Sequence, residues 1–301
     1  MPANKERPRA RRAPRAGWRT ARGSDRHELY ELSVQDPAAE VAFVDRCFRE
    51  RHGRVPALLR EDFCGTGWAS CEWVRHRKAN RAWGIDLCTR TMAWGKARHG
   101  AKLTPEQRAR MHWVHGDVRD RAAEPVEVIA ALNFSYFIFK TRAELLRYFR
   151  AAFANLRPGG MMVLDAYGGS DSFLEQTEER DLDGFTYLWH TERYNPINGD
   201  VLNRIHFRFP DGTEMRNAFT YDWRLWTLAE IQETLVEAGF VRPAVYWEGT
   251  TDDGEGDGVF RRKAVGEACE GWIAYIVAER PAGARGKAAA SGRGRRAKGK
   301  G

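Results

Sequence analysis

The sequence lacks any long apolar run. No stretch of its 301 residues approaches the roughly 18 consecutive apolar residues of a membrane helix. The first residues are rich in arginine and contain proline, without the apolar segment of a secretory signal peptide. These absences exclude a membrane span and a secretory leader, so we expect a cytoplasmic protein with no membrane partner.

Cysteine is scarce, and its spacing forms no CxxC pair. No group of His, Cys and Asp has the spacing of metal ligands, so we predict no metal site. The pattern argues against a disulfide scaffold or a zinc ribbon and favours a reducing compartment. A chain of this length with 43% hydrophobic residues buries a core without such crosslinks. The five cysteines are Cys47, Cys64, Cys71, Cys88 and Cys269.

Acidic residues are almost absent from the two ends of the chain. Residues 1–24 and residues 281–301 each have a net charge of +7, so the chain's total of +8 leaves −6 for residues 25–280. Neither end has apolar periodicity, and we predict that both are disordered. We favour solvated tails without a specific partner. The alternative, a weak and non-specific contact with nucleic-acid phosphates, stays open.

Strand and helix patterns alternate through the first half of the chain, which predicts an α/β fold with a doubly wound, mostly parallel sheet. The segment 126–132 is nearly all apolar, as expected for a strand buried on both faces. Helices are predicted at 37–51, 68–77, 89–99 and 142–156, and strands at 57–63, 82–87, 111–115, 126–132 and 161–166.

The second half begins with a different pattern. Polar and apolar residues alternate in segments separated by Asn198-Gly199 and Asp211-Gly212, which are hairpin turn signals. Thr227 and Glu230 form a capping box before a helix that Gly239 ends. We therefore predict one domain over 25–280 with an antiparallel hairpin layer inserted at about 170–226. Further predicted elements are strands at 185–194, 201–209, 214–222, 241–247 and 272–278 and a helix at 227–238.

Glycines and carboxylates stand at the ends of successive predicted strands. The first strand ends in Glu61-Asp62-Phe63-Cys64-Gly65-Thr66-Gly67, and Asp86 closes the second, nineteen residues past Gly67. Asp117 follows the third strand and Asn133 the fourth. Ligands of such sheets bind beyond the carboxyl ends of the strands, and glycines there allow close approach of the backbone.

In these segments the chain resembles the class I S-adenosylmethionine-dependent methyltransferases, whose first motif reads roughly DxGCGTG. The resemblance covers about Leu58 to Tyr167, and it implies a Rossmann-like sheet of seven strands, the last antiparallel. It implies S-adenosyl-L-methionine as the cofactor, with Glu61 near the methionine amino group, Asp86 at the ribose and Asp117 near the adenine. The complete set of expected cofactor contacts is Glu61, Cys64, Gly65, Gly67, Asp86, Leu87, Asp117, Val118 and Asn133.

One feature departs from the family's motif, and another separates this chain from a dehydrogenase. Phe63 stands where the family has its first glycine, which leaves the path of the loop open. Ser70 stands where the GxGxxG fingerprint of a nicotinamide dehydrogenase has its third glycine, so we favour the methyltransferase. Cys64 is expected to be an ordinary structural cysteine and not a nucleophile.

The candidate catalytic residues are Asn133 and Tyr136 after the fourth strand and His206, a candidate base, in the hairpin layer. Tyr30 and its neighbours could form a lid, or an ordinary approach to the first helix. We expect methyl transfer to a nucleophilic atom of a small molecule. An RNA or protein methyltransferase and a non-catalytic, nucleic-acid-associated protein are the alternatives. Asn133 is not followed by Pro-Pro-Tyr, which weakens an adenine or glutamine substrate.

Overall fold

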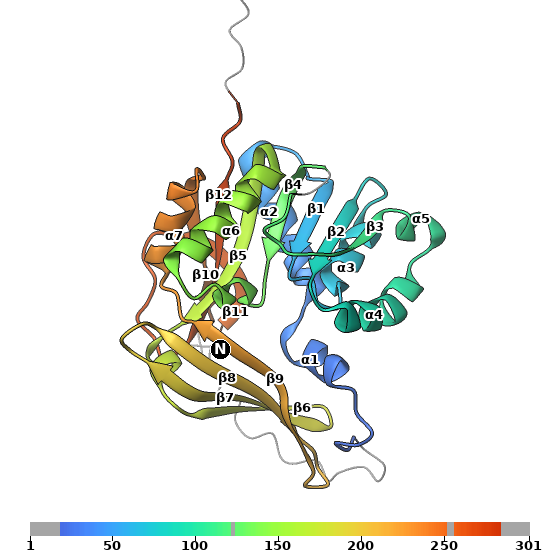
Figure 1. Cartoon of the computed structure of the whole chain (residues 1–301), viewed down its shortest axis with the longest axis vertical. Coiled ribbons are helices and arrows are strands. Elements are labelled where there is room, and N and C mark those ends of the chain that lie inside the picture. Colours follow the sequence, from blue (N-terminus) through green and yellow to red (C-terminus); the bar gives the residue numbers. More distant parts are fainter. Residues whose placement is uncertain (1–18, 122–123, 252–255, 284–301) are drawn as a thin grey trace, which may run out of the picture.

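The computed structural model describes residues 19–121, 124–251 and 256–283, and it contains two sheets, one above the other in Figure 1. The predictions for residues 1–18 and 284–301 lie outside the described residues. Residues 19–24, which the sequence assigned to the tail, make contacts: Arg19 pairs with Glu28 at 2.9 Å, and the Ala21 amide donates to the Thr213 hydroxyl at 3.1 Å.

The larger sheet confirms the predicted α/β, doubly wound architecture. Its order is β11-β10-β12-β5-β4-β1-β2-β3, with β1 to β5 parallel and β12 antiparallel to both of its neighbours. It has eight strands in the described chain, one more than the seven predicted, because β11 adds an edge. Its strands are β1 Leu58–Asp62, β2 Arg81–Asp86, β3 Met111–His115, β4 Val126–Ala131, β5 Leu156–Gly168, β10 Val241–Thr250, β11 Gly256–Lys263 and β12 Trp272–Glu279.

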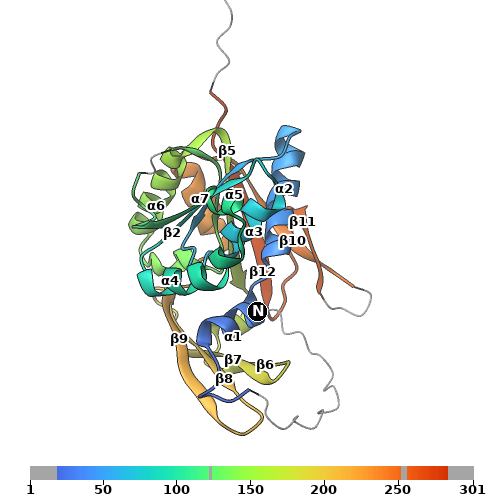
Figure 2. The ribbon, with the colours of Figure 1, turned by 90° about the vertical axis from the view of Figure 1, so that its right-hand side faces the viewer.

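Helices cover both faces of this sheet, α2 and α3 on one face and α6 and α7 on the other (Figures 1 and 2). The predicted capping box of Thr227 and Glu230 begins α7. No helix in the described segments is long and apolar enough to cross a lipid bilayer. The α-helices are α1 Arg26–Val34, α2 Pro37–His52, α3 Trp68–His76, α4 Thr89–Arg98, α5 Pro105–Arg108, α6 Arg142–Asn155 and α7 Leu228–Glu237; short 3-10 turns cover Gly100–Lys102, Ser135–Ile138 and Ser170–Phe173.

The smaller sheet is the predicted antiparallel layer, in the order β6-β7-β8-β9. Alternate residues of its strands, such as Ile205 and Phe207, join the same hydrophobic core as α6 and the end of β5. Gly199 and Gly212 have φ of +76° and +83°, as the predicted turns require. The strands are β6 Thr177–Leu182, β7 Phe185–Asn195, β8 Asp200–Arg208 and β9 Glu214–Arg224.

Helix α1 lies between the two sheets in both ribbon views (Figures 1 and 2). Asp25 caps it by accepting from the amides of His27 and Glu28. The Arg180 guanidinium, on β6, donates to the carbonyl of Ser33 near the helix end. The residues considered for a lid therefore belong to a helix that bridges the sheets.

Candidate active site

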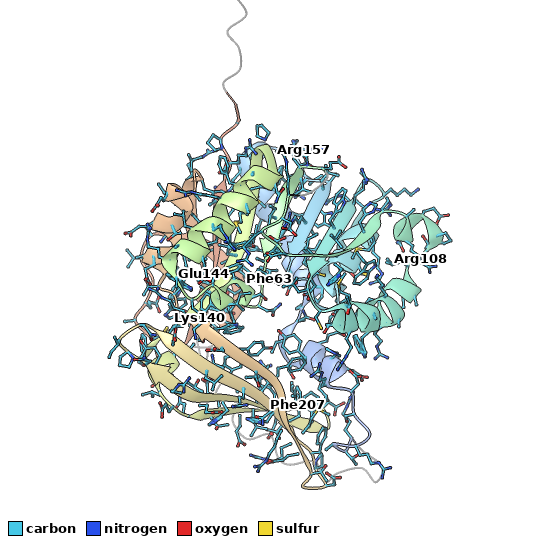
Figure 3. The ribbon with its side chains drawn as sticks, in the orientation of Figure 1. Phe63, Arg108, Lys140, Glu144, Arg157 and Phe207 are labelled. Atoms are coloured by element: carbon cyan, nitrogen blue, oxygen red, sulfur yellow. The ribbon has the colours of Figure 1, made fainter. Side chains whose placement is uncertain are left out.

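The loop that follows β1 takes three left-handed backbone conformations. Phe63, Gly65 and Gly67 have φ of +58°, +53° and +62°. Phe63 thus takes the left-handed conformation that favours glycine, so the loop keeps its path although the glycine of the family motif is replaced. Its ring packs against Phe139 at 6.0 Å and Tyr148 of α6 at 5.7 Å between ring centroids, beside α6 in Figure 3.

Neighbouring elements press against this loop. A Cβ on Gly67 would lie 2.5 Å from the ring of Trp113, so both its conformation and its surroundings require glycine. On α4, a Cβ on Gly95 would lie 2.0 Å from the carbonyl oxygen of Thr66. The loop therefore has a fixed path at the tip of β1.

Glu61 is buried at the start of this loop, with 8% of its surface exposed. Its carboxylate accepts from the Ser70 amide at 2.8 Å and from the Ser70 hydroxyl. Burial raises the pKa of Glu61 to about 7, although the bonds from Ser70 oppose the shift. The adjacent Asp62 has a structural role, since it pairs with Arg60 at 2.5 Å and accepts from the Tyr148 hydroxyl at 2.9 Å.

Asp86, at the end of β2, lies against the same loop. One of its oxygens accepts from the Gly65 amide at 2.8 Å and the other from the Cys88 amide at 2.7 Å. Leu87 is 64% exposed beside it, and Cys64 is buried. Burial raises the pKa of the Cys64 thiol well above its usual value, as expected for a structural cysteine.

The segment after β3 carries the two residues expected near adenine. Asp117 forms an ion pair with Arg119, whose hydrogen bonds lower the pKa of the carboxyl to about 2. Val118 is buried, and its carbonyl accepts from the Arg60 guanidinium at 2.6 Å. The Asp117 carboxylate therefore already has a cationic partner within its own loop.

The turn after β4 is held by a buried carboxylate that the sequence analysis did not single out. The amides of Asn133 and Phe134, both at positive φ, donate to Asp165 at 2.7 and 2.8 Å. Burial raises the pKa of Asp165 to about 7. In the sequence, Asp165 is the one acidic residue within the apolar segment of β5, and that position could have marked it as a candidate site residue.

Tyr136 packs beneath this turn inside the core, and His206 lies away from it. Tyr136 is fully buried, and its hydroxyl donates to the backbone carbonyl of Asp165 at 2.8 Å. His206 alternates with core-facing Ile205 and Phe207, so its side chain lies on the outer face of the smaller sheet. Its ring accepts from the Asn217 amide at 2.9 Å, and burial lowers its pKa.

A third carboxylate comes from the first turn of α2. Desolvation raises the pKa of Glu40 to about 8. The nearby charges of Glu61, Asp165 and Asp36 add to this shift. Glu40, Glu61 and Asp165 have no ion pair within the described chain. S-adenosylmethionine carries a positive sulfonium and a positive ammonium group. Two buried carboxylates, with the half-buried Glu40, beside a glycine loop therefore fit it.

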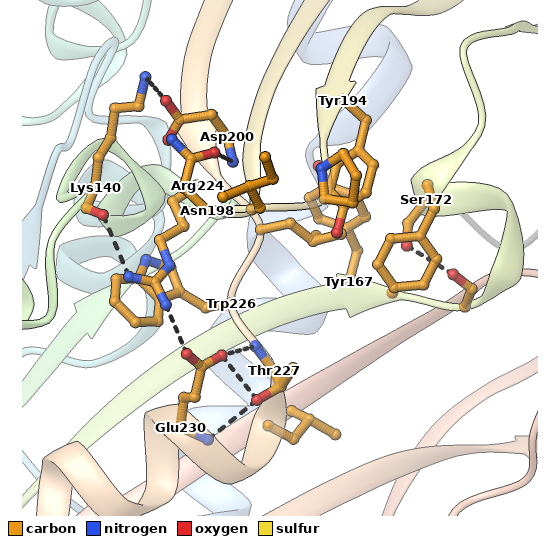
Figure 4. A pocket seen from close by; sticks show the side chains of 18 of the residues that line it. Lys140, Tyr167, Ser172, Tyr194, Asn198, Asp200, Arg224, Trp226, Thr227 and Glu230 are labelled. Atoms are coloured by element: carbon orange, nitrogen blue, oxygen red, sulfur yellow. Dashed lines mark hydrogen bonds and ion pairs between the residues drawn. The ribbon is translucent and has the colours of Figure 1, made fainter.

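A cavity of about 770 Å³ lies elsewhere, between the end of β5 and the β7–β8 hairpin (Figure 4). Four of its charged residues form two ion pairs, Lys140 with Asp200 at 3.1 Å and Arg224 with Glu230 at 2.7 Å. It shares Tyr167 with the core and includes none of the predicted cofactor contacts. Across the described residues, no three His, Cys, Asp or Glu side chains are grouped to hold a metal.

No protein-family model and no curated protein matches this sequence. Solved structures do match. An S-adenosylmethionine-dependent methyltransferase from Clostridium acetobutylicum aligns with a TM-score of 0.63 and 16% identity over 85% of this chain and 97% of its own. The sugar N-methyltransferase KedS8 from Streptoalloteichus has a TM-score of 0.58 and 23% identity over 86% and 93%.

The amino pentose methyltransferase CalS10 from Micromonospora echinaspora, solved with S-adenosylmethionine bound, aligns with a TM-score of 0.59 and 20% identity over 84% of this chain and 95% of its own. Each of these alignments spans at least 84% of this chain. The chain has the fold of the S-adenosylmethionine-dependent methyltransferases.

Proposed function

We propose that this protein is an S-adenosylmethionine-dependent methyltransferase whose methyl acceptor is a small molecule. One observation carries the proposal: the positive-φ loop after β1 is flanked by Glu61 and Asp86, at the tips of adjacent parallel strands. That edge of a doubly wound sheet is where ligands bind.

Each predicted contact has a role in this proposal. Glu61 faces the methionine amino group, while Gly65 and Gly67 let the backbone approach the methionine. The Asp86 oxygens have remaining lone pairs for the ribose hydroxyls. Asp117 and Val118 lie beside the adenine, with the exposed Leu87 covering its ring and Cys64 packing under the loop.

The cofactor supplies a methyl group that is already activated by a positively charged sulfur. The chain therefore needs no nucleophile of its own, and its main contribution is to hold the acceptor atom in line with the methyl group. Asn133 stands at the turn where the acceptor meets the methyl and is the proposed positioning residue. Tyr136 and His206 have no part in this step, because one is enclosed in the core and the other lies on the outer face.

A small acceptor is favoured because α1 and the smaller sheet lie over the edge that carries Glu61 and Asp86 (Figures 1 and 2). The similar structures include enzymes described as a sugar N-methyltransferase and an amino pentose methyltransferase. Only the basic ends of the chain support an RNA or protein substrate, or a non-catalytic role with nucleic acid.

Radiolabelled S-adenosylmethionine, incubated with the protein and a cell extract, tests the proposal. We expect label to enter the small-molecule fraction after size separation, and to disappear with the Glu61→Gln variant. The variant Glu28→Gln, at a half-buried position of α1 that pairs with Arg19 and Arg98, is the matched control and should retain activity. Label confined to RNA or protein, or no transfer by a protein that is folded, would contradict the proposed function.

A further inference from the structure

The cavity of about 770 Å³ at the end of β5 has no part in the cofactor contacts or in the proposed methyl transfer (Figure 4). Its volume is that of a pocket for a drug-sized small molecule. Aromatic side chains from separate parts of the chain meet in its wall: Tyr167 at the end of β5, Phe173 in the turn Ser170–Phe173, Tyr194 on β7, Trp226 before α7 and Trp272 on β12.

The charged side chains of the wall are already paired. In Figure 4, Lys140 and Arg224 lie on one side of the cavity and Tyr167 and Tyr194 on the other. All five charged residues of the wall have a partner of opposite charge within the described chain: Lys140 with Asp200 and Asp222, Arg224 with Glu230, and Arg142 with Glu237. The acid in excess, Asp222, is 63% exposed, so water and salt screen its charge.

A charged ligand therefore finds no unpaired opposite charge in this wall, whereas an uncharged ring finds aromatic surface. The Arg224 guanidinium also covers the Trp226 ring, 3.7 Å from its centroid, so that cation is stacked as well as paired. The Tyr194 hydroxyl forms no hydrogen bond with the described residues, and it can donate or accept one. The wall thus offers rings and a neutral polar contact.

The mouth of the cavity is apolar. Ile197, at the tip of the β7–β8 hairpin, is 93% exposed, and Phe173 is 50% exposed. Large apolar side chains that remain exposed together around a cavity are typical of a binding surface. A ligand that enters the cavity would cover both side chains.

Packed rings separate this cavity from the turn at Asn133. The centroid of the Tyr167 ring lies 4.8 Å from that of Phe134 and 5.7 Å from that of Phe137, and all three residues are buried. None of the expected cofactor contacts lines the cavity. A molecule held here is therefore separate from S-adenosylmethionine.

We propose that this cavity is a second binding site, which takes an uncharged small molecule built on fused or linked rings with a neutral hydrogen-bonding group. The rings lie against Phe173 and Trp272, and the polar group bonds to the Tyr194 hydroxyl. This site goes beyond the proposed function and does not depend on it.

Two fluorescent probes with the same ring skeleton test the ligand class. N-phenyl-1-naphthylamine is uncharged, and 8-anilino-1-naphthalenesulfonate adds one sulfonate to it. We expect the folded, full-length protein to bind the uncharged probe saturably at one site, and the sulfonate about tenfold more weakly. Equal or tighter binding of the sulfonate would overturn the uncharged class, and a lack of saturable binding of the uncharged probe would overturn the site.

Competition tests whether the site is a second one. S-adenosylmethionine, at a concentration well above that needed to saturate the protein, should leave the bound uncharged probe in place. Displacement of the probe would show that it occupies the cofactor site and would overturn the proposal. A protein that binds the probe but not S-adenosylmethionine would contradict the proposed function and leave the second site standing.

Two neighbouring alanine variants locate the site. Phe173 and Leu174 are each 50% exposed, but only Phe173 of the two lines the cavity. We expect Phe173→Ala to weaken binding of the uncharged probe about fivefold and Leu174→Ala to leave it unchanged. Tyr194→Phe, which keeps the ring and removes the hydroxyl, should weaken it about twofold. Equal affinities for the two alanine variants, both folded by circular dichroism, would overturn the placement of the site.

Discussion

Thr66, in the loop after β1, donates its hydroxyl hydrogen bond to Glu31 of α1 across 2.7 Å. The same Glu31 oxygen lies 2.6 Å from Nε2 of His99, at the end of α4, and all three residues are buried. The helix between the two sheets is thus bonded directly to the proposed cofactor loop. Any movement of α1 must break a buried contact of that loop.

Replacing Glu31 with alanine should weaken S-adenosylmethionine binding about tenfold and lower the melting temperature, because Thr66 and His99 lose a buried partner at about 1–3 kcal/mol each. Calorimetry and thermal unfolding measure both effects. Glu28→Ala, which removes half-buried ion pairs with Arg19 and Arg98 but no contact of the loop after β1, is the control and should leave the affinity unchanged. Equal affinities for the two variants would show that α1 does not support the loop.

The left-handed conformation of Phe63 gives a stability prediction. Both Phe63→Gly and Phe63→Ala remove the ring from Tyr148 and Phe139, but alanine retains a Cβ that is strained at φ +58°. We expect the glycine variant to be more stable than the alanine variant by about 1 kcal/mol in urea unfolding. An alanine variant as stable as the glycine variant would contradict this backbone conformation.

Asp86 both orders the loop and faces the proposed ribose site. Asp86→Ala should weaken S-adenosylmethionine binding by about 1.5–3 kcal/mol, through loss of hydrogen bonds from a charged group. Calorimetry on the folded variant measures the change. An unchanged dissociation constant would remove Asp86 from the cofactor site, whatever its effect on stability.

The buried carboxylates make stability depend on pH. Burial raises the pKa of Glu61 and Asp165 to about 7 and that of Glu40 to about 8, above their values of about 4 in an unfolded chain. The folded state therefore binds more protons between pH 4 and pH 8, and the stability present at low pH is lost as pH rises through the folded values. Without ligand, we expect the melting temperature to fall on the order of 5 °C from pH 5.5 to pH 8.5.

Glu40→Gln should flatten this dependence, since glutamine has no proton to lose. Glu50→Gln, on the exposed side of the same helix α2, should leave the slope as it is. S-adenosylmethionine should bind more tightly as pH rises over this range, because its positive groups favour the ionised carboxylates. A melting temperature that rises from pH 5.5 to pH 8.5 would show that these carboxyls are not held as described.

The alternation of strands and helices and the strand-end motifs were accessible from the sequence because they rest on local patterns. The apolar run of β4 and the Asn-Gly and Asp-Gly turns predicted their elements correctly. Strands β6 and β11 were missed, since Thr177–Leu182 and Gly256–Lys263 are polar edge strands whose pairing comes from neighbours distant in sequence. Their stability depends on tertiary contacts that no local periodicity records.

The individual site residues were harder to predict. Which face of a strand points inward depends on where the sheet packs, so the outer placement of His206 was not evident from its alternation. Tyr136 follows a strand end, as a site residue would, but its hydroxyl bonds to backbone within the core. Asp165 and Glu40 lie far apart in sequence and meet only through the packing of α2 on the sheet.

The central claim is that the loop after β1 binds S-adenosylmethionine, and a paired titration tests it most directly. Calorimetric titration of the full-length protein with S-adenosylmethionine and, separately, with NAD should show binding of the first alone. The Glu61→Gln variant should bind S-adenosylmethionine at least tenfold more weakly while Glu28→Gln binds as the unmodified protein does. Binding of NAD alone, or no binding of S-adenosylmethionine by the folded protein, would contradict the account.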